Sequence, residues 1–292
     1  MKPPVALLAL EKLQEDDRID RYTRFTVMGE PNGSSFTNEL IELFVVSHNQ
    51  AYNRLFEFLD KDEINQCLSV KGLLARISHR LSIPDSDVLT TRVIQFSGAG
   101  ADPVVIEPIE NSTIEPVSPS NLNKGVAYIE NGEKINAPFD FSEKNYLPLR
   151  SLHGVMKRLM FPENFTEEQQ FHLSPAHRVF VLNNMQTLPR EVGYEKTEFP
   201  DGYAKFLVLD DLEGAPLCIS RFAISRGWAY DYLMVAAYIL EKKSGREFSI
   251  SASIHVNANQ TFNDNEYEHE ELGAQFLGES GRQLIGFEEQ SN

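Results

Sequence analysis

Residues 225–247, SRGWAYDYLMVAAYILEKKSGRE, form the segment that most constrains the fold, because its middle is apolar on all sides. Ser225 can cap a helix at the start, and Lys242, Lys243 and Gly245 are typical of a helix C-terminus. A helix that is apolar all round is buried on every side. We therefore predict one buried central helix here, which the other elements of the fold must cover.

Helical periodicity dominates the first part of the chain, and extended segments dominate the second. Apolar spacing predicts helices within 36–60, at 70–81 and at 147–161, and strands at 177–184, 203–211, 215–225 and from 248 onward. Residues 95–140 are rich in Pro, Gly, Ser and Asn and are predicted to be irregular. This order indicates an α+β fold, a mixed β-sheet packed against helices. We expect a single domain over residues 1–292.

Charge and cysteine content exclude several classes of protein. The chain carries 43 acidic and 27 basic residues, a net charge of −16, so a nucleic-acid partner is not expected. Cys67 and Cys218 are far apart and belong to no metal-binding motif, so we expect neither a disulfide framework nor a bound metal. The sequence has neither a secretory signal pattern nor an apolar run long enough to span a membrane. We expect a cytoplasmic protein without a membrane partner.

The segment FSISASIHVNANQ, residues 248–260, raises the question of function. Apolar residues alternate with serines at its start, which predicts a strand with one buried face. The same phase carries His255, Asn257 and Asn259 onto one side. An imidazole and carboxamides can both donate and accept hydrogen bonds, so this strand end either holds a polar ligand or simply faces solvent.

Several short segments occur in an order that is typical of one family. They are SPAHRVFVLN at 174–183, FLVLDD at 206–211, Arg221, WAYD at 228–231 and the His255–Asn259 strand end, with weaker similarities in RYTRFTVMG and LFEFLDKDEIN upstream. Together they resemble the thymidylate synthase family, which includes the dCMP and dUMP hydroxymethylases. The resemblance covers residues 174–260 and, more weakly, 18–66. It implies a thymidylate-synthase-like fold.

The resemblance also implies a site for a pyrimidine nucleotide monophosphate. The roles that it implies are phosphate binding for Arg178, Arg221 and Arg24, base binding for Asp231, and sugar binding for His255 and Asn257. In the family the arginine-bearing strand reaches into the partner's site, so a homodimer is implied. An aspartate at the Asp231 position favours cytosine over uracil. An active member would be a transferase that uses methylenetetrahydrofolate to modify C5 of dCMP or dUMP.

One departure from the family leaves open whether the chain is an enzyme. The family's nucleophilic cysteine falls on Pro200, which cannot attack a ring carbon. Cys218 is the nearest other thiol, and we interpret it as a buried apolar residue rather than a nucleophile. The alternative to an active transferase is a pseudoenzyme, a catalytically inactive fold reused for nucleotide binding or protein assembly, with no cofactor.

Overall fold

The computed structural model describes residues 1–97, 103–113, 120–205, 207, 219–241 and 245–290. For Arg221 and most other residues of its strand, only the backbone is described. The chain divides into two compact units. The first comprises residues 1–115 and 144–185, and the second comprises 116–143 and 186–292. No helix among the described residues is long and apolar enough to cross a membrane.

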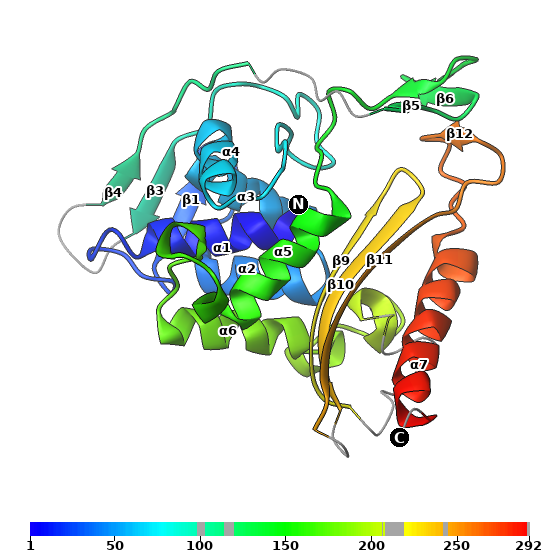
Figure 1. The fold of residues 1–292 in the computed structure, drawn as a ribbon. Coiled ribbons are helices and arrows are strands. Elements are labelled where there is room, and N and C mark those ends of the chain that lie inside the picture. Colours follow the sequence, from blue (N-terminus) through cyan, green and yellow to red (C-terminus); the bar gives the residue numbers. More distant parts are fainter. Residues whose placement is uncertain (98–102, 114–119, 206, 208–218, 242–244, 291–292) are drawn as a thin grey trace. The chain divides into compact units, whose positions relative to one another are not determined.

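The first unit is mainly helical, with a small sheet at one side (Figure 1). Its elements are α1 Lys2–Leu13, β1 Arg24–Val27, β2 Ser34–Ser35, α2 Phe36–Val45, α3 Asn49–Leu59, α4 Lys61–Val70, β3 Ile94–Ser97, β4 Val104–Ile106, α5 Leu149–Met160, two short 3-10 turns and α6 Pro175–Gln186. Residues 3–10 and Leu13 of α1 are all buried, and α1 packs against α2, α3, α4 and α5. Helix α1 is therefore the central helix of this unit.

Aromatic side chains join the small sheet of this unit to its helices. The sheet is antiparallel in the order β2-β1-β3-β4. Phe25 on β1 lies 5.3 Å from Phe36 on α2 between ring centroids, and Phe36 lies 4.8 Å from Phe58 on α3. These rings are almost completely buried, and such tilted and edge-on pairs stabilise a core beyond their buried area.

The second unit is built on a three-stranded sheet with a C-terminal helix (Figure 1). Its elements are β5 Asn123–Lys124, β6 Ala127–Glu130, β7 Glu133–Ile135, β8 Phe139–Asp140, 3-10 turns at Pro189–Val192 and Asp201–Ala204, β9 Ile219–Ala229, β10 Tyr232–Glu241, β11 Glu247–His255, β12 Thr261–Phe262, a π-helical turn His269–Ala274 and α7 Gln275–Gln290. The main sheet is antiparallel in the order β11-β10-β9.

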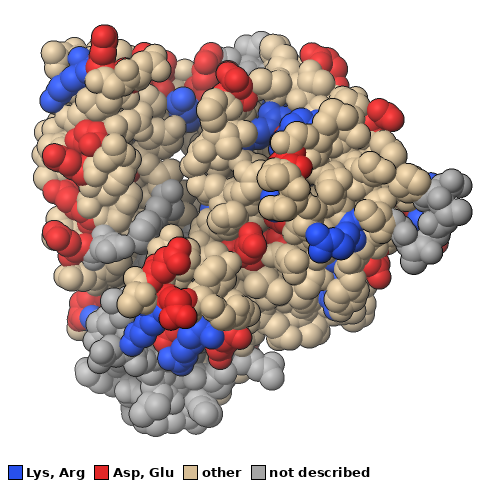
Figure 2. All heavy atoms as spheres, turned by 180° about the vertical axis from the view of Figure 1, so that it is seen from behind, with Lys and Arg blue, Asp and Glu red and all other residues tan. Residues whose placement is uncertain are grey.

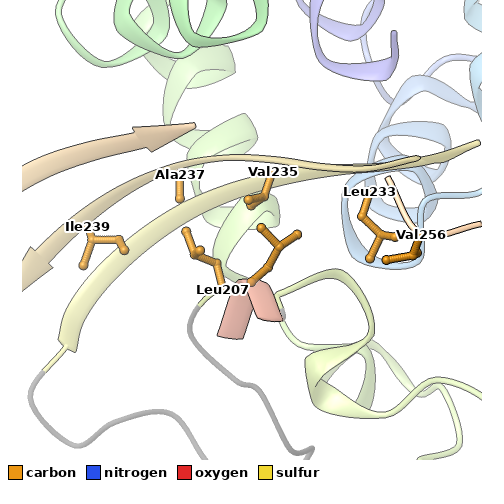
Figure 3. Packing of buried hydrophobic residues seen from close by; sticks show 7 residues of the cluster. Leu207, Leu233, Val235, Ala237, Ile239 and Val256 are labelled. Atoms are coloured by element: carbon orange, nitrogen blue, oxygen red, sulfur yellow. The ribbon is translucent and has the colours of Figure 1, made fainter. Parts of the chain in front are cut away.

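The core of this unit lies between β10 and α7 (Figure 3). It consists of seven buried residues, Leu207, Leu233, Val235, Ala237, Ile239, Val256 and Leu277. The odd-numbered residues of β10 point to this core because side chains alternate along a strand. Ala236 and Tyr238, on the other face of β10, are buried as well. The central strand is thus covered on both faces.

The predicted buried helix at 225–247 is wrong, because the end of β9 and the whole of β10 occupy most of that segment. A strand buried on both faces is a continuous apolar run, and periodicity cannot distinguish it from a buried helix. The strand predicted at 177–184 is also wrong, since it lies inside α6. The helix predicted at 70–81 is wrong too, because α4 ends at Val70.

Of the other predicted elements, the strand at 203–211 is wrong where it is described, because Tyr203 and Ala204 lie in a 3-10 turn, and the rest are confirmed in their described parts. Helices α2 and α3 lie within 36–60, and α5 lies within 147–161. Strand β11 coincides with the predicted strand but ends at His255. Strand β9 begins at Ile219, inside the strand predicted at 215–225. Residues 208–211 and 215–218 of the predicted strands lie outside the described part of the chain.

Candidate functional site

A lysine at the start of the buried central helix is the first element of the candidate site. Lys2 is the first residue of α1, and Pro3 and Pro4 follow it in the first turn, where an absent N–H costs no helical hydrogen bond. The Lys2 ammonium nitrogen Nζ donates to the Ser47 hydroxyl Oγ at 2.8 Å and also to the Ser47 carbonyl oxygen. Both atoms of this pair are only partly buried, so the pair remains accessible.

Ser47 lies in the short link between α2 and α3. Its backbone is in the left-handed region, with φ of 58°, which a residue other than glycine adopts at a cost. The link is held to the last turn of α2, because the backbone N–H of His48 donates to the carbonyl of Glu42. This turn presents the Ser47 hydroxyl and carbonyl on the same side, toward Lys2.

The two residues after Ser47 complete a polar cluster. His48 is exposed, and its ring nitrogen Nδ1 lies 3.1 Å from a carboxylate oxygen of Glu42. The hydrogen bond with His48 holds the pKa of Glu42 below its ordinary value, against the effect of burial. Asn49, the first residue of α3, donates from its side chain to the Ser82 hydroxyl at 2.8 Å. The cluster Lys2, Ser47, His48, Asn49 and Glu42 is referred to below as the Lys2 cluster.

Helix α3 fixes this cluster through buried contacts with the segment around residues 79–82. Asn53, which is 1% exposed, donates to the carbonyl of Leu81 and accepts from its N–H, at 2.9 and 2.7 Å. The hydroxyl of the fully buried Tyr52 donates to the carbonyl of His79. These bonds join the first turns of α3 to a second segment, so the Ser47 turn rests on a rigid support.

The Lys2 cluster can transfer protons. A serine hydroxyl within hydrogen-bond reach of a lysine amine is the geometry of a nucleophile or proton carrier with its base. The cluster has no three-residue group of metal ligands, and the described part of the chain holds no such group elsewhere.

The residues that the sequence assigned to one nucleotide site are divided between the two units. Arg178 on α6 and Arg24 on β1 belong to the first unit, whereas Asp231, His255 and Asn257 belong to the second. The Arg178 guanidinium donates to the carbonyls of Leu159 and Met160 at the end of α5. The Arg24 guanidinium donates to the carbonyl of Gly33. Both guanidiniums therefore donate hydrogen bonds to backbone carbonyls. The side chain of Arg221 lies outside the described residues.

The structure does bring Asp231, His255 and Asn257 together. Asp231 lies in the turn between β9 and β10, and the Asn257 amide donates to its carboxylate at 2.6 Å. His255 is opposite Tyr232 in the sheet, and the two rings stack 4.2 Å apart. Burial, reinforced by Lys124, lowers the pKa of His255. Pro200 precedes a 3-10 turn, and Cys218 lies outside the described residues.

Sequence reasoning missed the Lys2 cluster. Two signals could have indicated it: the Ser-x-Asn at residues 47–49 directly before a helix, and a lysine at the head of an entirely apolar helix. Each signal is weak alone, and Lys2 and Ser47 are 45 positions apart in the chain. Only the packing of α1 against α2 and α3 brings them into contact.

Comparison with solved structures shows a β-lactamase-like fold. The alignment with a β-lactamase from Burkholderia vietnamiensis covers 100% of this chain and 81% of the β-lactamase chain, with a TM-score of 0.57 and 11% sequence identity. The chromosome-encoded β-lactamase of Vibrio parahaemolyticus matches 99% and 83%, with TM-score 0.55 and 10% identity. A mutant of PBP-A, solved as an acyl-enzyme complex with penicillin G, matches 98% and 80%, with TM-score 0.52 and 14% identity.

No family model matches the chain, and no curated protein is similar to it in sequence. The structural matches correct the thymidylate synthase resemblance, the fold that it implied and the pyrimidine-nucleotide function. The α+β class holds, but as a β-lactamase-like fold. The short segments that suggested thymidylate synthase belong to other elements here: the expected arginine strand is helix α6, and the expected central helix is strand β10. The folate and homodimer expectations came from that resemblance, and neither the structure nor the matches test them.

Proposed function

We propose that this chain is an acyl-transfer protein of the penicillin-recognising type, in which Lys2 and Ser47 are the proton-transfer pair. The observation that carries this is the 2.8 Å hydrogen bond from the Lys2 amine to the Ser47 hydroxyl, in a chain with a β-lactamase-like fold. When an amide or lactam bond breaks, the leaving nitrogen needs a proton. The Ser47 oxygen bonds to the carbonyl carbon as the carbon–nitrogen bond breaks, and the Ser47 hydroxyl proton passes to the leaving nitrogen while Lys2 stays hydrogen-bonded to the same oxygen.

The Lys2 cluster agrees in part with the motifs of this class. Class A β-lactamases and penicillin-binding proteins carry S-x-x-K, S-D-N and K-T-G motifs. Ser47-His48-Asn49 has the first and third residues of S-D-N. Lys2 is hydrogen-bonded to Ser47, so we compare it with the lysine of S-x-x-K. The S-x-x-K motif does not occur in the printed sequence, so Ser47 is the serine assigned to the acyl bond, and Lys2 is its partner in proton transfer.

Two departures favour a second candidate, a protein of this fold that binds an acyl ligand reversibly without turning it over. The aspartate of S-D-N is replaced by His48, and K-T-G does not occur in the printed sequence. Lys243-Ser244-Gly245 is the nearest equivalent, but it connects β10 to β11, and its first two residues lie outside the described part.

The test is the covalent capture of a fluorescent penicillin by the protein at its native length, read by gel fluorescence and intact mass. We expect the mass of the protein to increase by the mass of the penicillin. The rate of adduct formation should fall by about 100-fold or more in Lys2→Met and in Ser47→Ala, because a positioned proton donor contributes about that much to the rate. Lys157→Met is the matched control, because Lys157 is an exposed lysine on α5. Its labelling rate should equal that of the wild type.

Three outcomes separate the candidates. Reversible binding of the penicillin in calorimetry, without any adduct, would support the second candidate. An adduct that forms equally fast in Lys2→Met and the wild type would contradict the assigned proton-transfer pair. Neither binding nor an adduct with penicillins and simple thioester probes would reject both functions.

A further inference from the structure

A second polar cluster, at the turn between β9 and β10, has no part in the proposed acyl transfer. Ala229 pairs with Tyr232, so Tyr230 and Asp231 are the two residues of the hairpin turn. Both have a left-handed backbone, with φ of 52° and 63°, as a two-residue type I′ turn requires. The Asp231 side chain is nevertheless 1% exposed. Turn residues are usually solvated, and a buried carboxylate requires partners.

The partners of Asp231 come from the chain just after β11. The Asp231 carbonyl accepts from the N–H of Val256 at 2.9 Å, and one carboxylate oxygen, Oδ2, accepts from the Asn257 amide Nδ2 at 2.6 Å. The other carboxylate oxygen, Oδ1, is buried without a partner, and so is the Asn257 amide oxygen Oδ1. Each of these two atoms can only accept a hydrogen bond while Asp231 is ionised.

One proton satisfies both atoms. If Oδ1 of Asp231 carries it, the acid donates to Oδ1 of Asn257 while Nδ2 of Asn257 donates to Oδ2 of Asp231. We propose that Asp231 is protonated in the folded protein at mildly acidic pH and forms a two-bond acid–amide pair with Asn257, which latches the β9–β10 turn to the chain after β11. No other group has to enter the site, since the pair satisfies itself.

Burial and the charged groups around the turn favour the neutral acid. The pKa of Asp231 is raised to about 6, chiefly by burial and also by the carboxylates of Asp264 and Glu268, while the hydrogen bond from Asn257 acts against this. The remaining titratable neighbours are aromatic. Burial raises the pKa of Tyr230, Tyr232 and Tyr267, and the carboxylates of Asp231 and Asp264 also raise that of Tyr267. Burial lowers the pKa of His255, which stacks on Tyr232.

The direction of the pH effect follows from this pKa. The carboxyl titrates at about 6 when folded and near 3.8 when unfolded, so the folded protein holds its proton more tightly. The stabilisation is fully present below about pH 4 and is lost as the pH rises through 6. Above that value an ionised Asp231 faces the amide oxygen of Asn257 and two like charges, and the latch keeps a single hydrogen bond.

Two measurements test the latch. In a 13C NMR titration of the aspartate carboxyls, the Asp231 signal should titrate near pH 6, well above exposed aspartates. In thermal unfolding, Asp231→Asn should match the wild type at pH 4.5 and exceed its Tm at pH 8 by roughly 2–8 °C. The new amide makes the same two bonds at every pH, and asparagine tolerates the left-handed backbone.

Asp140→Asn is the control, because Asp140 is an exposed aspartate of the same unit on β8. It should show no such pH-dependent gain. Titration of Asp231 near 3.8 would overturn the proposal. So would a lower Tm of Asp231→Asn at both pH values, which would mean that the ionised carboxylate is the stabilising form. The titration uses the wild type, so it decides the question even if the variant folds poorly.

Discussion

At the scale of single residues, Glu57 shows how this acidic chain uses a buried charge. The Glu57 side chain is fully buried on α3 and accepts from the Arg80 guanidinium at 2.7 and 3.0 Å. It also accepts from the side chain and the backbone N–H of Arg92, both at 2.9 Å. Burial opposes the ionisation of Glu57, but these hydrogen bonds outweigh it and hold its pKa below the ordinary value.

Replacing Glu57 by glutamine should therefore destabilise the protein strongly. Glu57→Gln leaves a buried guanidinium without its counter-charge, and breaking such a pair costs about 3–5 kcal/mol. Urea unfolding at pH 7 measures the loss. Glu279→Gln, which breaks an exposed pair with Arg282 on α7, is the matched control and should leave stability unchanged. An equal effect of the two substitutions would show that burial of Glu57 does not matter.

At the scale of elements, glycines set how closely α7 approaches the rest of its unit. A Cβ at Gly281 would overlap the backbone carbonyl oxygen of Leu207, which cannot move without shifting the chain. A Cβ at Gly273, in the turn before α7, would lie 2.6 Å from a terminal methyl carbon of Leu233, which can rotate away. The two positions therefore differ in the kind of obstacle that a side chain would meet.

Gly281→Ala should cost more stability than Gly273→Ala. We expect about 1–3 kcal/mol for Gly281→Ala, because overpacking against the backbone forces α7 away from the core that includes Leu277. Gly273→Ala should cost clearly less. Gln283→Ala, at an exposed position of α7, controls for helix propensity and should cost nothing. Thermal and urea unfolding of the three variants provide the comparison, and equal costs would contradict the close approach at Leu207.

At the scale of the whole molecule, the net charge of −16 sets the electrostatics. On the face in Figure 2, acidic side chains of the described residues are scattered, and basic side chains occur in separate small groups. Folding concentrates this excess of negative charge, so self-repulsion opposes the compact state. Salt screens interactions between exposed charges more than those of buried pairs such as Glu57–Arg80.

Added salt should therefore stabilise the protein. Raising NaCl from about 10 mM to about 150 mM shortens the screening length from about 30 to about 8 Å. We expect the Tm to rise by roughly 2–4 °C, the shift that about 1 kcal/mol produces in a domain of this size. KCl should act equally, because screening does not depend on the identity of the cation. A fall in Tm with salt would mean that exposed attractive pairs outweigh the net repulsion.

The sequence by itself determined the elements whose periodicity has one meaning. Helices α2, α3 and α5 have an apolar stripe at helical spacing, and β11 begins with strict alternation of apolar and polar residues. In α2 and α5 the buried residues form one stripe, so the pattern records both the period and the direction of the core. These elements sufficed for the α+β class.

Only the tertiary structure decided the rest. An apolar run such as β10 becomes a strand because β9 and β11 pair with it on both sides, and no local signal records those partners. The candidate site has the same origin. Lys2 and Ser47 are 45 residues apart, and their contact depends on how α1 packs against α2 and α3. Contacts between distant residues are set by the packing of whole elements, which a single sequence does not encode in any short segment.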